Sequence, residues 1–131
     1  MFVTDTHPLI WFSTRKHSQL SSKVLSAFDK ANEGDLLIYI PAVVLWEIAI
    51  LQNLGKINLP ERFDFWSSNL LRKKGFILIP LEPSIIANAV NYNFNNDLFD
   101  KIIVASAVDF DLPLITKDSA ITNSNVVEIY W

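Results

Sequence analysis

The chain has 131 residues, half of them hydrophobic and 19% charged, which is enough for one domain with a substantial core but not for two. It contains no cysteine, which excludes disulfides, zinc–thiolate sites and thiol catalysis and suits a reducing compartment. Its net charge of −3 is not the basic excess of proteins that hold nucleic acid by phosphate neutralisation alone.

The N-terminal segment predicts a strand rather than a secretion signal. A secretion signal has a basic segment followed by a long apolar one, whereas here Asp5 directly follows Phe2 to Thr4. We therefore expect a cytoplasmic protein. The apolar stretch at residues 36–51 is shorter than the roughly 20 residues that a membrane helix needs, and it contains Pro41 and Glu47. A strand followed by a helix fits it better, and we expect no membrane association.

Short β-type runs alternate with helical patterns, which predicts an α/β fold with a central, mainly parallel, five-stranded sheet flanked by helices on both faces. The predicted strands are short and apolar: Phe2–Thr4, Leu37–Ile40, Phe76–Ile79, Leu114–Thr116 and Val126–Tyr130. Helices are predicted from about Pro8, Ser21 or Ser22 (to Gly34), Ala42 (to Leu54), Pro60 (to Gly75), Ser84 (to Tyr92), Leu98 (to Phe110) and Ser119 (to Thr122). No linker or repeat interrupts this order, so residues 1–131 are expected to form one domain.

Two acidic residues stand out in the first half of the chain. Asp5 follows the first strand, where the open end of a parallel sheet commonly carries a ligand site; the alternative is that it is only the N-cap of the next helix. Glu47 lies in a helix that is apolar nearly all round, which predicts a buried helix. A buried carboxylate needs a partner, and no Lys or Arg lies within one helical turn. The alternative is that Glu47 lies on a thin exposed stripe.

Three further acids lie at the predicted starts of helices. Asp97 and Asp100 share one face at the start of an apolar helix; Asp97 is a natural N-cap, whereas Asp100 faces apolar neighbours. Asp118 follows a short strand and could cap the small helix after it. Because strand ends and helix N-termini of a parallel sheet converge at one edge, Asp5, Glu47, Asp100 and Asp118 are predicted to meet there.

Four carboxylates at one edge would repel each other. At ~5 Å and an effective dielectric constant of ~20, each pair costs roughly 3 kcal/mol, against a total stability of about 5–15 kcal/mol for a domain. Protonation, water or cations must therefore relieve the repulsion. An all-oxygen ligand set without cysteine favours Mg²⁺ or Mn²⁺.

With its acids in this order, the chain resembles the PIN-domain ribonucleases, particularly the VapC-like toxin subunits of type II toxin–antitoxin pairs. The resemblance extends over the whole chain and rests on several segments in order: Asp5-Thr6-His7 with Leu9-Ile10-Trp11, Trp46-Glu47-Ile48-Ala49 with Gly55-Lys56, Asp97-Leu98-Phe99-Asp100-Lys101, Thr116-Lys117-Asp118, and Trp131.

This resemblance implies a metal-dependent endoribonuclease that leaves a 5′-phosphate and a 3′-hydroxyl. It implies that Asp5, Glu47, Asp100 and Asp118 are the catalytic acids and bind one or two Mg²⁺ or Mn²⁺ ions, with Asp97, Thr116 and Thr6 as auxiliary candidates. It also implies an RNA substrate, a cognate antitoxin and a homodimer. The family usually has proline and arginine where this chain has Leu98 and Lys101, so Lys101 is left out of the site.

The sequence leaves two alternatives. The first is a PIN-like domain that binds a partner but does not cut. The second is a receiver-type phosphoacceptor domain, which is also a five-stranded α/β unit. A receiver domain, like a haloacid-dehalogenase-like phosphatase, should have paired acids after its first strand, whereas Asp5 is followed by Thr6 and His7.

Overall fold

In the computed structural model, which describes residues 1–131, five parallel strands form one sheet in the order β3-β2-β1-β4-β5. The predicted α/β class and the five strands are thereby confirmed, and the order differs from the 2-1-3-4-5 order of flavodoxin-like and receiver domains. The strands are β1 (Phe2–Thr4), β2 (Ile38–Pro41), β3 (Phe76–Ile79), β4 (Leu114–Ile115) and β5 (Ile129–Tyr130).

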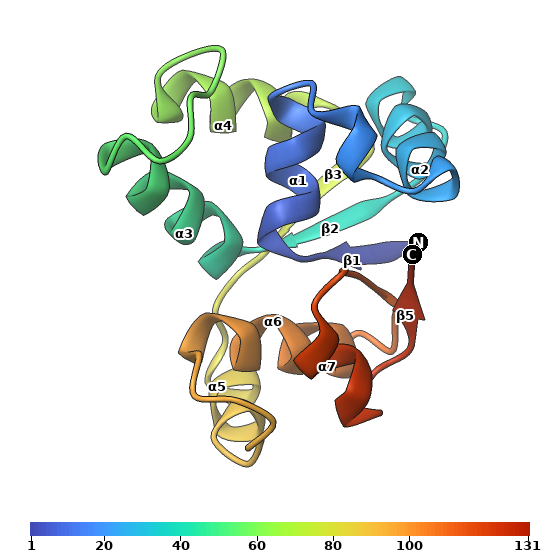
Figure 1. Ribbon diagram of the computed structural model, residues 1–131, viewed down its shortest axis with the longest axis vertical. Helices are drawn as coiled ribbons and strands as arrows, with labels where there is room; N and C mark the ends of the chain where they lie inside the picture. The colour runs from blue at the N-terminus through green and yellow to red at the C-terminus, as the bar shows by residue number, and fades with distance from the viewer.

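Helices cover both faces of the sheet (Figure 1). Those before β3 lie on one side: α1 (Thr6–Ser13), α2 (Ser22–Glu33), α3 (Ala42–Asn53) and α4 (Phe63–Arg72), with a short 3₁₀ turn at His17–Gln19. Those after β3 lie on the other side: α5 (Pro83–Ala89), α6 (Leu98–Asp109) and α7 (Ser119–Ser124). Right-handed crossovers explain the change of side, because the chain reverses its direction across the sheet after β3. None of the helices has the length and apolar character that crossing a membrane requires.

The reversal places a switch point between β1 and β4, where open α/β sheets bind their ligands beyond the carboxyl ends of the strands. Thr4 of β1 is in register with Ile115 of β4, so the residues that follow them, Asp5 and Thr116, come side by side. The backbone N–H of Asp5 donates to the Ile115 carbonyl at 3.0 Å, which anchors this junction. Strand register therefore sets the first two residues of the site.

The predicted helix start at Pro60 is wrong. Helix α4 begins at Phe63, and Pro60 lies in the segment before it. The reason is the neighbouring Leu59, which is buried and whose N–H donates to the side-chain oxygen of Gln52 on α3 at 3.0 Å. This hydrogen bond to α3 keeps the segment around Pro60 out of a helix.

The predicted last strand is too long, because only Ile129–Tyr130 pairs with β4. Asn125 adopts the left-handed conformation with φ 54°, and the N–H of Val126 donates to the Ser124 hydroxyl at 3.3 Å. These local interactions hold the residues between α7 and β5 in a turn, so the strand begins only at Ile129. Termini that are far apart in sequence nevertheless meet, since β1 and β5 both flank β4 (Figure 1).

Helix α3 is not buried on all sides, contrary to the prediction. Val43, Val44 and Ile48 are buried, but Trp46 is 60% exposed. The ring of Trp46 packs edge-on against Phe99 at 5.5 Å between centroids, so it lies on a solvent-facing seam between α3 and α6. Glu47, next to this exposed side, is half-buried.

Gly75 precedes β3 and is required for the packing of α2 against the sheet. A Cβ atom there would lie 2.0 Å from the carbonyl oxygen of Ala31 in α2. We expect Gly75→Ala to lower the free energy of unfolding by about 3 kcal/mol or more, because backbone must move to relieve this overlap. Gly55→Ala, at φ +70° with open space around the site, should cost about 1 kcal/mol through backbone strain alone. Urea unfolding of both variants measures the difference, and equal losses would contradict the packing argument.

Candidate acidic site

A cavity of about 380 Å³ opens beyond the carboxyl ends of the strands, and acids from separate elements line it. Asp5 comes from the end of β1, Glu47 from α3, Asp97 and Asp100 from the start of α6, and Asp118 from the loop after β4. The four acids predicted to converge thus do lie around one cavity. The remaining lining residues are His7, Pro8, Trp11 and Lys117.

Asp5 is the most enclosed of these acids, with 7% of its surface exposed. One carboxylate oxygen accepts the backbone N–H of Thr6 at 2.7 Å, and the other accepts the hydroxyl of Thr116 at 2.6 Å. Asp5 therefore caps α1 and also lines the cavity. The N-cap explanation is confirmed, and the ligand site stays a prediction. Burial raises its pKa above the usual value; the hydrogen bonds oppose this shift.

Glu47 is held from a neighbouring element. The hydroxyl of the fully buried Thr6 donates to the Glu47 carboxylate at 2.5 Å, which links the start of α1 to the middle of α3. Burial is the main cause that raises the pKa of Glu47, and the charges of Asp5 and Asp97 add to it. Thr6, an auxiliary candidate, thus positions Glu47 through its hydroxyl and Asp5 through its backbone N–H.

The two acids of α6 have different tasks. Asp97 is the N-cap, since its carboxylate accepts the N–H groups of Phe99 and Asp100 at 2.9 and 3.2 Å. The carboxylate of Asp100 is half-buried and accepts the side-chain N–H of Asn95 at 2.8 Å. Asn95 in turn accepts the Asp97 N–H at 3.0 Å, so the turn before α6 orients both acids.

Asp118 also combines a cap with a place in the cavity. Its carboxylate accepts the N–H of Ile121 at 2.9 Å and so begins α7. Its own N–H donates to the hydroxyl of Thr116 at 3.1 Å, and that hydroxyl donates to Asp5. Thr116, which is fully buried, therefore connects the first and the last acid of the site.

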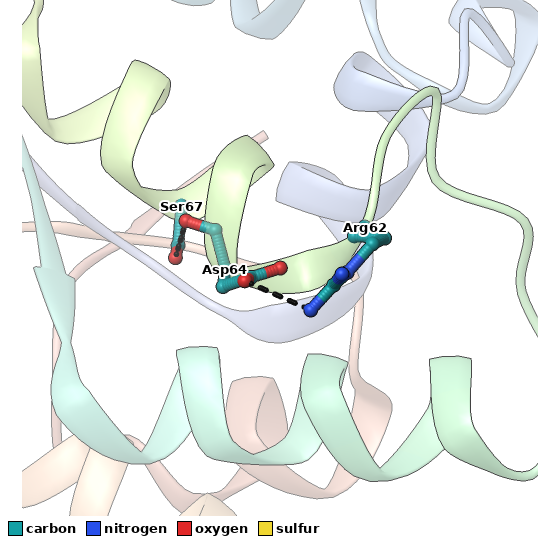
Figure 2. Close-up of polar contacts among 3 residues, drawn as sticks. All are labelled: Arg62, Asp64 and Ser67. Carbon is teal, nitrogen blue, oxygen red and sulfur yellow. Dashed lines mark hydrogen bonds and ion pairs between the residues drawn. The ribbon is translucent and has the colours of Figure 1, made fainter.

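No lysine, arginine or histidine pairs with any of these acids. The one salt bridge of the structure joins Arg62 and Asp64 at 3.1 Å on the exposed surface of α4, where Figure 2 shows it beside Ser67. The acids of the cavity therefore form no salt bridge, although Lys117 and His7 line the same cavity. Unpaired carboxylates in a partly buried site favour protonation or a bound cation.

The residues present fit a hard divalent cation in their chemistry, because the donors are carboxylate oxygens with hydroxyl neighbours. No group of three or more of these side chains is arranged as a ready set of ligands for one ion. Binding would therefore require side-chain adjustment at the half-buried Glu47 and Asp100, which face the cavity.

Some residues of the site were not found by reasoning from the sequence. Asn95 lies in a turn rich in asparagine, and its role depends on its contact with Asp100. His7 is exposed and lines the cavity, although the sequence marks it only as part of the Asp5-Thr6-His7 segment. Trp11 and Lys117 belong to the segments that carried the family resemblance, which was the one available signal for them.

The pKa of Asp100 is raised to about 7, first by burial and then by the charges of Asp97, Asp5 and Asp118, while the Asn95 hydrogen bond opposes the shift. The folded state therefore binds this proton more tightly than the unfolded chain. Its stabilising effect is present below about pH 4 and is lost as the pH rises to about 7. In EDTA, the free energy of unfolding of the native chain should fall across this pH range by about 1–2 kcal/mol more than that of Asp100→Asn. The full pKa shift would give a larger fall, but water screens the half-buried carboxylate. Urea unfolding at several pH values tests this, and parallel curves would contradict it.

Comparison with known proteins identifies the family. The family model described as "PIN domain" matches residues 2–124. No curated protein sequence matches the chain. Among solved structures, the chain is similar to one from a Klebsiella pneumoniae toxin–antitoxin complex, with 18% identity, a TM-score of 0.65, and 97% of this chain and 95% of that chain covered.

Two further structures have the same fold at low sequence identity. VapBC2 from Rickettsia felis, bound to a DNA fragment from its promoter, matches with 13% identity and a TM-score of 0.71, covering 99% of this chain and 98% of that one. FitAcB from Neisseria gonorrhoeae matches with 16% identity and a TM-score of 0.64, covering 100% and 97%. Because the family model spans nearly the whole chain and these structures have the same fold, this protein belongs to the PIN domain family.

Proposed function

We propose that this protein is a divalent-metal-dependent endoribonuclease and acts as the toxin of a VapC-like toxin–antitoxin pair. The observation that carries the chemistry is the set of acids from separate elements that line one cavity without a salt bridge. PIN domains of such toxins are typically nucleases. The similarity to chains from toxin–antitoxin complexes supports the second part of the proposal.

Asp5, Glu47, Asp100 and Asp118 would hold the metal, with Mg²⁺ or Mn²⁺ suited to an all-oxygen set. When bound, such an ion lowers the pKa of a water molecule and neutralises charge on the scissile phosphate. One of the carboxylates accepts the proton of the attacking water. Hydrolysis would leave a 5′-phosphate and a 3′-hydroxyl, and it needs no covalent intermediate.

The auxiliary residues serve to fix the acids. Thr116 orients Asp5, and Thr6 orients Glu47, each by a short hydrogen bond. Because these hydroxyls are fully buried, they hold two carboxylates in place without competing water. Asp97 lies close enough to raise the pKa of Glu47 and Asp100, so we assign it to the electrostatics of the site and to capping rather than to a ligand role.

The protein partners we propose are a cognate antitoxin and a second copy of the chain. Large apolar side chains are available for such contacts on α3 and around α5 and α6. They are Trp46 (60% exposed), Leu54 (60%), Val90 (73%) and Leu98 (73%). Apolar surface of this kind is commonly covered by a partner.

The experiment that tests the proposed function is cleavage of a mixed RNA pool by the purified protein with Mg²⁺ or Mn²⁺. We expect cutting that EDTA and Asp5→Asn each abolish, with 5′-phosphates on the products. A protein that binds metal but cuts no RNA would instead be a partner-binding PIN domain.

A further inference from the structure

The wall of the cavity is not only acidic. Beside the acidic residues, the lining includes the aromatic residues His7 and Trp11, both from α1, and Lys117 from the loop after β4. The rings are 5.8 Å apart between centroids at 47°. His7 is exposed and Trp11 is partly exposed, so both of these lining residues are open to solvent.

Lys117 is the one lysine or arginine that lines the cavity. It follows Thr116 and precedes Asp118, yet it forms no salt bridge with any carboxylate. Its ammonium nitrogen instead lies 6.0 Å from the centroid of the Trp11 ring and 5.9 Å from that of Trp131. The positive charge is thus held near the indoles and stays available to an anion that enters the cavity.

Trp131 explains how Trp11 is held. Its ring meets the Trp11 ring edge-on at 6.2 Å, and both pack against the hydrophobic core. Trp131 does not line the cavity, so core packing accounts for its position. Trp11 also lines the cavity, and core packing does not account for that. An aromatic surface, a free cation and an acidic pocket therefore lie within one cavity.

We propose that His7, Trp11 and Lys117 form a base-stacking subsite, in which the rings take one unpaired nucleobase of RNA and Lys117 takes an adjacent phosphate. The substrate class rests on the proposed nuclease function. Aromatic rings stack on bases whose faces are free, so the subsite selects single-stranded RNA over duplex. Stacking of one base on an aromatic side chain changes affinity by roughly 5- to 150-fold.

The test is equilibrium binding of two labelled hexamers in Mg²⁺, one of oligoadenylate and one of abasic ribose phosphates. Binding is measured by fluorescence anisotropy. All proteins carry Asp100→Asn, which prevents cutting. We expect the adenylate hexamer to bind about 10-fold more tightly than the abasic one. Trp11→Leu should abolish this preference and leave the abasic hexamer's affinity unchanged. Trp11→Phe should retain most of the preference, and Trp46→Leu, an exposed tryptophan outside the cavity, should retain all of it.

Lys117→Ala should behave differently from the tryptophan variants. It removes a charge and not a ring, so both hexamers should bind more weakly by the same factor, and the slope of log affinity against log salt concentration should become shallower by about 0.7. An adenylate preference that survives Trp11→Leu would overturn the subsite. The two proposals can fail separately. If the native chain cuts no RNA but the Trp11-dependent preference for adenylate is found, the nuclease proposal alone is overturned. If the native chain cuts RNA and that preference is missing, the subsite alone is overturned.

Discussion

Asp100→Asn should reduce metal-dependent RNA cleavage at least about 100-fold, since it removes a proposed negative ligand but keeps the shape of the side chain. The same change should not unfold the protein. It removes a carboxylate whose ionisation is disfavoured by burial and by Asp97, Asp5 and Asp118, so the variant should be at least as stable as the native chain at pH 8 in EDTA. Initial rates on one RNA substrate, with thermal melting of both proteins, test the two parts together.

Asp109→Asn is the matched control for this measurement. Asp109 ends the same helix, α6, is exposed, and does not line the cavity, so its replacement makes the same change in charge. It should leave the cleavage rate within about twofold of the native rate, because surface charges away from a site contribute little. Equal losses in the two variants would mean that net charge, and not the position of Asp100, controls cleavage.

Millimolar Mn²⁺ should raise the melting temperature of the native protein. A free metal concentration about 100 times the dissociation constant stabilises the folded state by about 2.7 kcal/mol, or roughly 8–10 °C for a domain of this size. The expected physical reason is that a cation bound in the folded cavity would relieve the repulsion among its carboxylates. Differential scanning calorimetry with Mn²⁺ and with EDTA gives the shift directly.

Ionic strength needs a separate control, because any salt screens repulsion. NaCl at the same ionic strength should therefore produce a much smaller shift than Mn²⁺. Asp100→Asn should lose more than half of the Mn²⁺ response and Asp109→Asn none of it. An equal response in all three proteins would place the metal outside the cavity.

Much of the fold could be predicted because its signals are local. Ser21 accepts the N–H of Val24 and begins α2 as its position before an amphipathic run indicated, and Gly34 ends that helix in the left-handed conformation. Strand β3 likewise has the predicted bounds. Predictions were wrong where a specific side-chain contact competes with the general signal, as at Pro60, where the hydrogen bond from Leu59 to Gln52 of α3 precedes a later start of α4.

The sequence by itself determined which acids stand at strand ends and helix starts, since capping preferences and periodicity act within a few residues. That information was sufficient to predict Asp5, Asp100 and Asp118 at one edge of a parallel sheet. Glu47 lies in the middle of α3, and it was singled out by its apolar neighbours instead. Only the tertiary structure decided how they are held. The bond from Thr116 to Asp5 spans 111 positions and that from Thr6 to Glu47 spans 41. Such bonds depend on strand order and helix packing, and these follow from burial over the whole chain rather than from any local pattern.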